Sequence, residues 1–301
     1  MSEYEHKQTF DERYRYLKRR LTMLRVWTGV IVVAAFLLAC VMDTYLSMSS
    51  KFNSAVPFAV GVLGVVILGK KKGPIKEEIE TMKSYAAGAI LEQKLSALTV
   101  YDPFSAIGSD VVGWLNLPMG CDRISGSDLV EGSWRGVPVR FSDVRLVTVY
   151  NDDTEQTTFK GQMFALGMKR KIQGRVWIGK VPLLRKRGYA KHFGLEIEDA
   201  AALAGQNVFA SSQEAADAVL TGVYASRLRD AFNRANDKLY LCFDGDTLYG
   251  ALNSKRDLFE GGGDQEWDAL VSRGSQELDE LLGLIDCLTD APDLFDRTKA
   301  A

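Results

Sequence analysis

The sequence predicts an α+β protein in which an N-terminal two-helix transmembrane hairpin precedes a mainly antiparallel α+β soluble domain. Three observations lead to this prediction. Two uncharged apolar windows lie close together at residues 26–42 and 52–69. Short segments rich in β-branched residues, separated by turn residues, fill the middle of the chain. Amphipathic helical patterns return in the last third, which places strands and helices in separate runs.

The two apolar windows predict membrane-spanning helices with both outer ends in the cytoplasm. They are 17 and 18 residues long, close to the ~17–25 residues that a spanning helix needs. Basic residues flank the pair on its outer sides, and cytoplasmic flanks carry such an excess. These residues are Arg19, Arg20, Arg25, Lys70, Lys71 and Lys72. We therefore expect only the loop 43–51 outside. A re-entrant second segment is the alternative, because Pro57 and nearby glycines weaken that helix.

A lipoprotein signal would reverse this topology, since residues 37–40 resemble a cleavage box that ends at Cys40. The tail before the first window is 25 residues long and contains acidic residues such as Glu3 and Glu12. Secretory leaders are short and basic instead. The sequence thus favours Cys40 as an ordinary residue of a membrane helix.

The pattern divides the chain into five segments. They are a basic cytoplasmic tail at 1–25, the transmembrane hairpin at 26–72, a linker helix at 73–99, the α+β domain at 100–260, and an acidic C-terminal helix and tail at 261–301. Pro74 suits the first turn of the linker helix. That helix is predicted to end near Leu98, because the Asp102-Pro103 pair beyond it disfavours helical backbone.

Within the soluble domain, strand signals come first. Residues 129–134 and 137–141 flank Arg135-Gly136, which is typical of a hairpin turn. Alternating, β-branched stretches at 144–150 and 157–168 predict two further strands, and 175–180 and 207–210 two short ones.

Helices and one more hairpin follow. Ser211 and Glu214 form a capping box that predicts a helix over 213–220, and Thr221 caps a second helix over 222–234. Residues 239–243 and 247–251 flank Asp244-Gly245, a strong two-residue hairpin signal. Three glycines at 261–263 precede a final amphipathic helix.

Several of these segments resemble a known bacterial family, the domain of unknown function 3137. The resemblance rests on the stretches 122–132 and 137–144, on the Phe-x-Gly-x-Phe-like strand 159–164, and on later landmarks at 195–199, 220–221 and 257–260. Members of this family carry an N-terminal membrane hairpin. The resemblance therefore implies a multi-pass protein of the bacterial inner membrane, and the basic flanks predict that its N-terminus and C-terminal domain are cytoplasmic. It implies no activity and no catalytic residue.

Charge is distributed unevenly although the formal net charge is only −2. Residues 156–195 contain ten basic and no acidic side chains, whereas residues 257–296 contain twelve acidic ones. Anionic lipid headgroups could bind the basic segment, at ~1 kcal/mol for each cation near the surface. The candidate contact residues are Lys169, Arg170, Lys171, Arg185, Lys186 and Arg187. Pairing with the acidic C-terminal helix is the competing interpretation. Nucleic acid is disfavoured, because no aromatic series or recognition module accompanies the charges.

The sequence contains no catalytic constellation, and we expect neither a cofactor nor a metal. Four scattered cysteines and two histidines, His6 and His192, lack metal-ligand spacing. We expect a non-enzymatic, membrane-anchored binding or adaptor protein, whose protein partner, if it has one, is unknown. The alternative is a membrane-bound hydrolase that uses the carboxylates of Asp244 and Asp246.

Overall fold

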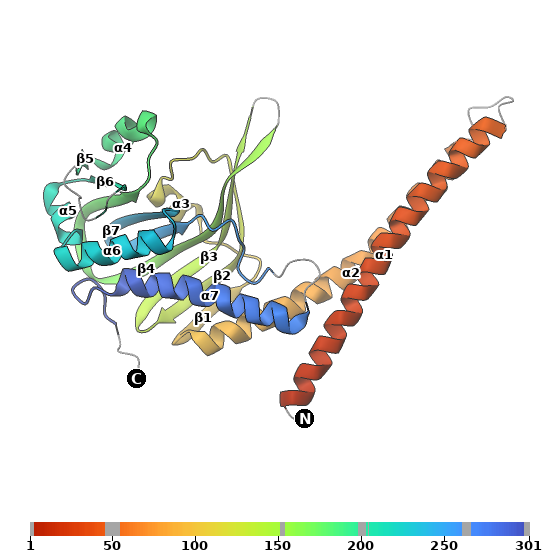
Figure 1. Ribbon diagram of the computed structural model, residues 1–301, viewed down its shortest axis with the longest axis horizontal. Coiled ribbons are helices and arrows are strands. Elements are labelled where there is room, and N and C mark those ends of the chain that lie inside the picture. The colour runs from red at the N-terminus through yellow and green to blue at the C-terminus, as the bar shows by residue number, and fades with distance from the viewer. Residues whose placement is uncertain are drawn as a thin grey trace. The chain divides into compact units, whose positions relative to one another are not determined.

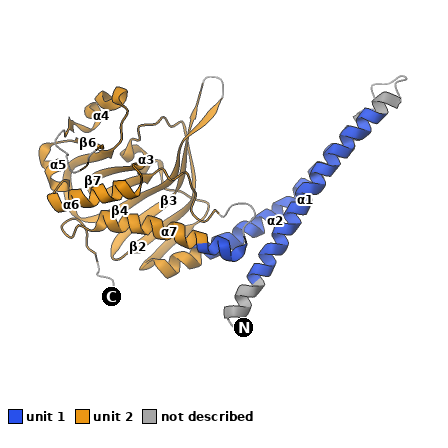
Figure 2. Ribbon diagram, in the orientation of Figure 1, with its two compact units in different colours: residues 1–87, 261–272 blue, residues 88–260, 273–301 orange. Residues whose placement is uncertain are grey.

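The structure is a computed structural model that describes residues 3–45, 55–150, 154–197, 203, 205–260 and 266–297. The loop 43–51 and the glycines at 261–263 therefore lie wholly or mostly outside the described residues. The chain forms two compact units, shown in different colours in Figure 2. The first comprises Met1–Ala87 and Gly261–Ser272, and the second comprises Gly88–Glu260 and Arg273–Ala301.

The first unit is built on two long helices, α1 (Glu3–Tyr45) and α2 (Ala55–Lys94), the latter as far as Ala87. They pack antiparallel, because a residue later in α1 contacts a residue earlier in α2. Lys72 Nζ donates to Thr28 Oγ1 at 2.7 Å. Further along α1, Ala35 contacts Gly61 of α2. A Cβ added to Gly61 would lie 2.6 Å from the Cβ of Ala35, so only glycine allows this close approach.

One helix of the described residues, Phe10–Val41, is long and apolar enough to cross a membrane, by length and composition. Its apolar side chains between Val26 and Val41 are largely exposed. The predicted second span is not established, since part of the window 52–69 falls outside the described residues. What the structure supports is an apolar N-terminal helix, paired with a second helix, ahead of a mixed α+β domain.

No separate linker helix begins at Pro74. Helix α2 continues through this proline, ends at Lys94, and is followed by a strand from Ala97 that the sequence analysis missed. A proline inside a helix removes one backbone hydrogen bond and costs ~3 kcal/mol in isolation. Here Ile75, Ile79 and Met82 are buried in the core of the first unit, and this packing offsets the break.

A seven-stranded sheet forms the centre of the second unit (Figure 1). Every strand pair is antiparallel, which confirms the predicted α+β class. The order is β1-β2-β3-β4-β6-β5, and β7 pairs with β4. The strands are β1 (Ala97–Asp102), β2 (Arg123–Trp134), β3 (Val137–Val149), β4 (Glu155–Gly179), β5 (Leu195–Glu196), β6 (Asn207–Ala210) and β7 (Leu239–Leu252).

Helices cover both faces of this sheet. Besides α2 they are α3 (Ser109–Leu115), the 3-10 turn η1 (Leu183–Arg185), α4 (Lys186–Phe193), α5 (Gln213–Val219), α6 (Gly222–Arg234) and α7 (Trp267–Thr289). Side chains of α3 and α4 join one core cluster around Trp177. Helices α6 and α7 cross the opposite face, where Tyr224 Oη donates to the carbonyl oxygen of Leu288 at 2.8 Å (Figure 1).

The structure confirms one predicted hairpin and corrects the other. Arg135 and Gly136 have φ of 50° and 84°, as a type I′ turn requires, and connect β2 to β3. Asp244-Gly245 is not a turn, because β7 continues through it and pairs with β4 on both sides. Gly245, at φ 60°, instead pairs with Ile172 at a point where the register shifts, and the extra residues of this irregularity lie on β4. The cap of α5 is Ser212 rather than Ser211, and its side chain accepts from Ala215 N.

Candidate functional site

The six predicted contact residues lie on two different elements. Lys169, Arg170 and Lys171 belong to β4, whereas Arg185 ends η1 and Lys186 and Arg187 begin α4. The two triplets are close in sequence, but an extended strand rises about 3.3 Å per residue and carries them apart. The basic segment is therefore not one continuous surface element.

The β4 triplet lies where the pairing of β4 with β7 changes register. No regular partner is assigned between Gly167 and Ile172. All three side chains are exposed, and the backbone N of Lys169 donates to the carbonyl oxygen of Leu294 at 2.9 Å. This triplet is a solvated group of cations without an apolar side chain of comparable exposure beside it.

The triplet in η1 and α4 lies beside two leucines that are largely exposed to solvent. Leu183 is 81% and Leu184 97% exposed, although both sit in a regular 3-10 turn. Leu184, Arg187 and Lys191 share the outer face of this turn and helix, because residues three and four apart lie on one side. We call Leu183, Leu184, Arg185, Arg187 and Lys191 the η1/α4 tip.

The tip rests on a rigid support. Tyr189 and Phe193, on the inner face of α4, are buried and lie 4.7 and 6.0 Å from the ring of Trp177. Trp177 itself is fully buried and donates from Nε1 to the carbonyl oxygen of Leu115 at 2.7 Å. The two exposed leucines thus precede a helix, α4, whose inner face is packed against the core.

Most cations of the tip are available to an external partner. Arg185 Nη1 donates to the carbonyl oxygen of Pro118 at 2.8 Å, and the neighbouring Lys186 pairs with Glu196 at 2.6 Å. Within the described part of the chain, the side chains of Arg187 and Lys191 form no hydrogen bond or ion pair. An apolar pair beside unpaired cations matches the interface of an anionic bilayer, which accepts both.

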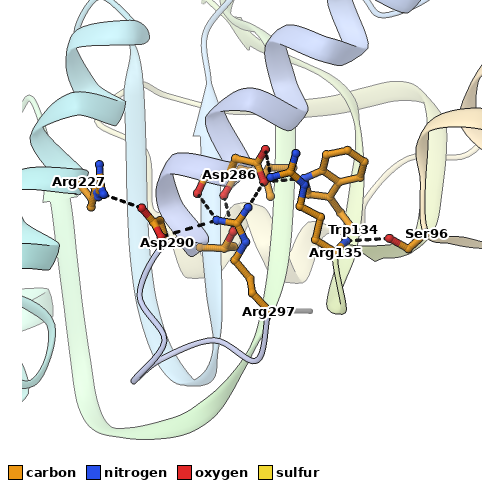
Figure 3. Close-up of polar contacts among 9 residues, drawn as sticks. Ser96, Trp134, Arg135, Arg227, Asp286, Asp290 and Arg297 are labelled. Carbon is orange, nitrogen blue, oxygen red and sulfur yellow. Dashed lines mark hydrogen bonds and ion pairs between the residues drawn. The ribbon is translucent and has the colours of Figure 1, made fainter. Parts of the chain in front are cut away.

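The acidic C-terminal stretch has other partners. Figure 3 shows Asp286 between Arg297, at 2.7 Å, and Arg135, at 3.1 Å, with Trp134 Nε1 donating to it as well. Asp290 pairs with Arg227 at 2.9 Å in the same close-up. These contacts fasten the end of the chain and α7 to the β2–β3 hairpin and to α6.

An ion pair between Lys160 and Asp257, at 2.6 Å, connects the basic segment 156–195 to the acidic stretch 257–296. None of the six candidate residues pairs with that stretch in the regions that the structure covers. The interpretation that the acidic helix neutralises these cations therefore has no support from these contacts.

The carboxylates of the hydrolase alternative, Asp244 and Asp246, have separate partners. Asp244 is bound by Arg175, whose Nη2 lies 3.1 Å from Oδ2, and the guanidinium stacks on Trp114 at 4.6 Å. Asp246 is exposed and accepts from Thr247 Oγ1 at 3.2 Å. Across the described residues, no group of three or more His, Cys, Asp or Glu could hold a metal ion.

The leucines of the tip were missed by sequence reasoning, which recorded only the charges around them. The available signal was an apolar pair, Leu183-Leu184, directly after Pro182 and before three consecutive basic residues. In a buried strand or helix the same pair would be unremarkable, so its exposure had to come from the structure.

The fold and the tip define a class of protein: an apolar N-terminal helix joined to a sheet domain with a basic, apolar-tipped projection. Residues 157–289 match the profile of the family described as "Protein of unknown function (DUF3137)", which confirms the predicted resemblance. The match runs from β4 to the end of α7 and covers less than half of the chain. The stretches 122–132 and 137–144 lie before the matched region.

Other comparisons add little. No curated protein matches the sequence. Among solved structures, the mycobacterial trehalose monomycolate transport factor A, TtfA, aligns with 68% of this chain and 93% of its own, at 12% sequence identity and a TM-score of 0.35. That score is too low for any statement about a shared fold or function.

Proposed function

We propose that this chain is a non-enzymatic, membrane-anchored binding protein of the bacterial inner membrane, whose sheet domain contacts the anionic cytoplasmic leaflet through the η1/α4 tip. In this proposal α1 and the apolar first part of α2 cross the membrane as a hairpin. Exposed apolar side chains on both helices, such as Phe36 and Phe58, support two spans. The N-terminus and the sheet domain are then both cytoplasmic, in accord with the basic flanks.

The observation that carries the proposal is the pair Leu183 and Leu184, almost fully exposed beside unpaired cations. Complete burial of a leucine is worth ~1.5–3 kcal/mol, so the pair can contribute about 3–6 kcal/mol on entering the lipid interface. Arg185, Arg187 and Lys191 add about 1 kcal/mol each near an anionic surface. The leucines are therefore expected to provide the larger share of binding, and the cations its lipid selectivity.

Hydrogen exchange of the full chain in nanodiscs tests this contact. We expect residues 182–193 to exchange more slowly in discs that contain phosphatidylglycerol than in discs of phosphatidylcholine alone. Raising the salt concentration should reverse part of the protection, because the Debye length shrinks to ~3 Å at 1 M. Replacement L183S/L184S should remove most of the protection, and R187Q/K191Q a smaller, salt-sensitive part.

Two matched controls accompany these variants. V223S removes an apolar side chain on α6 that is similarly exposed, and K169Q/R170Q/K171Q removes three cations from β4. Both should leave the protection of residues 182–193 unchanged. Equal exchange in the two kinds of disc, or protection that persists in L183S/L184S, would contradict membrane contact by the tip. Protection lost with the β4 triplet instead would move the contact to that strand.

The topology is tested by thiol labelling in intact cells. The starting variant replaces Cys40, Cys121 and Cys287 by serine, since these three thiols are not fully buried. A cysteine at Ser49 is expected to react with an impermeant reagent, because the loop 43–51 is proposed to lie outside. A cysteine at Ser272, an exposed position, should react only after lysis. Labelling at Ser272 but not at Ser49 in intact cells would reverse the proposed orientation.

A further inference from the structure

A second candidate site, distinct from the tip, is a cavity of about 420 Å³ in the sheet domain. This volume is within the range of small-ligand sites. The lining comes from four places: β4 with Gln162, the end of α6 with Arg234 and the turn after it with Lys238, the loop after β7, and α7 with Glu277. Such convergence from distant parts of the sequence is typical of ligand sites, whereas a surface groove on one element is not.

Glu277 is the unusual group in this lining. Its side chain is only 8% exposed, and Arg273 Nε donates to Oε1 at 2.9 Å. The other oxygen, Oε2, is buried and accepts no hydrogen bond. Buried carboxylate oxygens without a donor are costly and rare in folded proteins, so Oε2 marks a position where a donor from a ligand would be favourable.

The other acidic groups of the cavity already have partners. Asp257 pairs with Lys160 at 2.6 Å, Asp279 with Lys94 at 2.8 Å, and Glu280 with Arg256 at 3.6 Å. Glu277 is also paired, with Arg273, but its buried Oε2 has no donor and is the acceptor with spare capacity.

Two cations of the lining are unpaired. Arg234 and Lys238 form no side-chain hydrogen bond or ion pair with any residue that the structure describes. Once the paired charges are set aside, the cavity therefore presents two cations and one hydrogen-bond acceptor. Its electrostatic complement is an anionic group together with a separate donor.

The floor of the cavity is held in place by a buried polar network. Gln162 Nε2 donates both to Asp143 Oδ1 at 2.7 Å and to the carbonyl oxygen of Arg256 at 2.9 Å. The backbone N of Leu258 donates to Asp143 Oδ2. Because these bonds fix the loop that carries Ser254 and Arg256, the cavity is formed before any ligand enters.

We propose that this cavity binds a small organic anion that carries a hydrogen-bond donor. Its phosphate or carboxylate pairs with Arg234 and Lys238, and its ammonium or hydroxyl group donates to Glu277 Oε2. Aminoalkyl and hydroxyalkyl phosphates carry both groups. The same chemistry occurs in free metabolites and in phospholipid headgroups, and the experiment separates these two sources.

Calorimetry on the full chain in phosphatidylcholine nanodiscs provides the test, with ethanolamine phosphate and glycerol 3-phosphate as probes. We expect saturable binding of at least one probe. Inorganic phosphate lacks the carbon-borne donor and ethanolamine lacks the anion, so each should bind at least tenfold more weakly. No binding of either phosphate ester at millimolar concentration would overturn the proposal.

Variants assign the roles of the lining residues. R234A/K238A should weaken binding of the active probe at least tenfold, and because both side chains are exposed, the fold should be unaffected. E277Q should weaken it similarly, since the new amide nitrogen donates where the ligand also donates. R229A, on the outer surface of α6 and not in the lining, is the matched control and should bind as the wild type does.

A structural role for Glu277 predicts a different result. In that case E277Q would lower the unfolding temperature and leave probe affinity unchanged, which would refute the assignment. The source is decided by hydrogen exchange of residues 252–258 in nanodiscs. Slower exchange with phosphatidylethanolamine in the disc and no soluble probe indicates a lipid headgroup, and slower exchange with the soluble probe alone indicates a free ligand. This outcome is independent of contact by the η1/α4 tip.

Discussion

W177A is expected to lower the stability of the sheet domain by about 3–5 kcal/mol, the range for truncating a large buried aromatic side chain. Trp177 is fully buried in β4 and lies within 6.2 Å, between ring centroids, of Tyr189, Phe193, Phe209 and Tyr240. Its indole N–H also donates to Leu115 at the end of α3. Alanine would leave a cavity among four rings and an unpaired carbonyl oxygen.

The expected loss extends to the η1/α4 tip. Because Tyr189 and Phe193 rest on Trp177, hydrogen exchange of α4 should accelerate in W177A more than that of α6 on the opposite face. Thermal unfolding followed by near-ultraviolet circular dichroism measures the stability. W177F keeps most of the packing and loses the donor, so a smaller loss of about 1 kcal/mol is expected.

W27A is the matched control for this substitution. Trp27 is exposed on α1 of the first unit, so its removal should not change the unfolding of the sheet domain. A W177A midpoint equal to that of the wild type would mean that α4 does not depend on this cluster.

Local patterns were sufficient for the elements whose conformation is decided by a few neighbouring residues. The Arg135-Gly136 turn is an example, because positive φ at two successive positions selects such sequences wherever two strands are joined. The predicted strands at 144–150 and 157–168 fall almost wholly within β3 and β4, since β-branched and alternating apolar residues run through both segments.

The same turn chemistry was misleading at Asp244-Gly245. Strand β4 is 25 residues long, and β7 pairs with it from Gln162 to Ile178. A hairpin at Gly245 would have given up the pairing of one half of β7 with β4. Long-range pairing therefore outweighed the local preference, and the glycine lies within the continuous strand β7, opposite the irregular part of β4.

Neither candidate site could be derived from the sequence alone. The cations of residues 169–187 are close in sequence but distributed over a strand, a 3-10 turn and a helix. Cavity residues such as Gln162, Arg234 and Glu277 are separated by tens of positions and meet only in the folded sheet domain. Charge composition predicted that the basic segment is a surface feature, and only the structure showed which cations lack partners.

D143L is the second substitution with a large expected effect, a loss of about 2–6 kcal/mol. Asp143, on β3, is 2% exposed and accepts hydrogen bonds from Gln162 Nε2 and from the backbone N of Leu258. Leucine is similar in size but accepts neither bond. Each donor left buried and unpaired costs about 1–3 kcal/mol. D246L, at an exposed carboxylate on β7, is the control and should change stability by less than about 0.5 kcal/mol.

Asp143 also makes the stability depend on pH in a predictable direction. Burial raises the pKa of its carboxyl group well above the usual range, and the nearby carboxylates of Asp128 and Asp257 raise it further. The hydrogen bonds from Gln162 and Leu258 oppose this shift without cancelling it. Lys160, which pairs with Asp257, is the basic group close to this cluster.

Because the pKa is higher in the folded state than in the unfolded state, folding takes up a proton at this site. The contribution of Asp143 to stability is therefore complete below the unfolded pKa of ~3.9 and declines as the pH rises toward the folded pKa. Within that window the decline approaches about 1.4 kcal/mol per pH unit. Urea unfolding of the wild type and of D143L, measured at intervals from pH 4 to pH 8, should show a stability difference that shrinks as the pH rises. A difference that grows with pH would show that the ionised carboxylate is the form the fold prefers, and that the two donors, rather than burial and neighbouring charge, control its protonation.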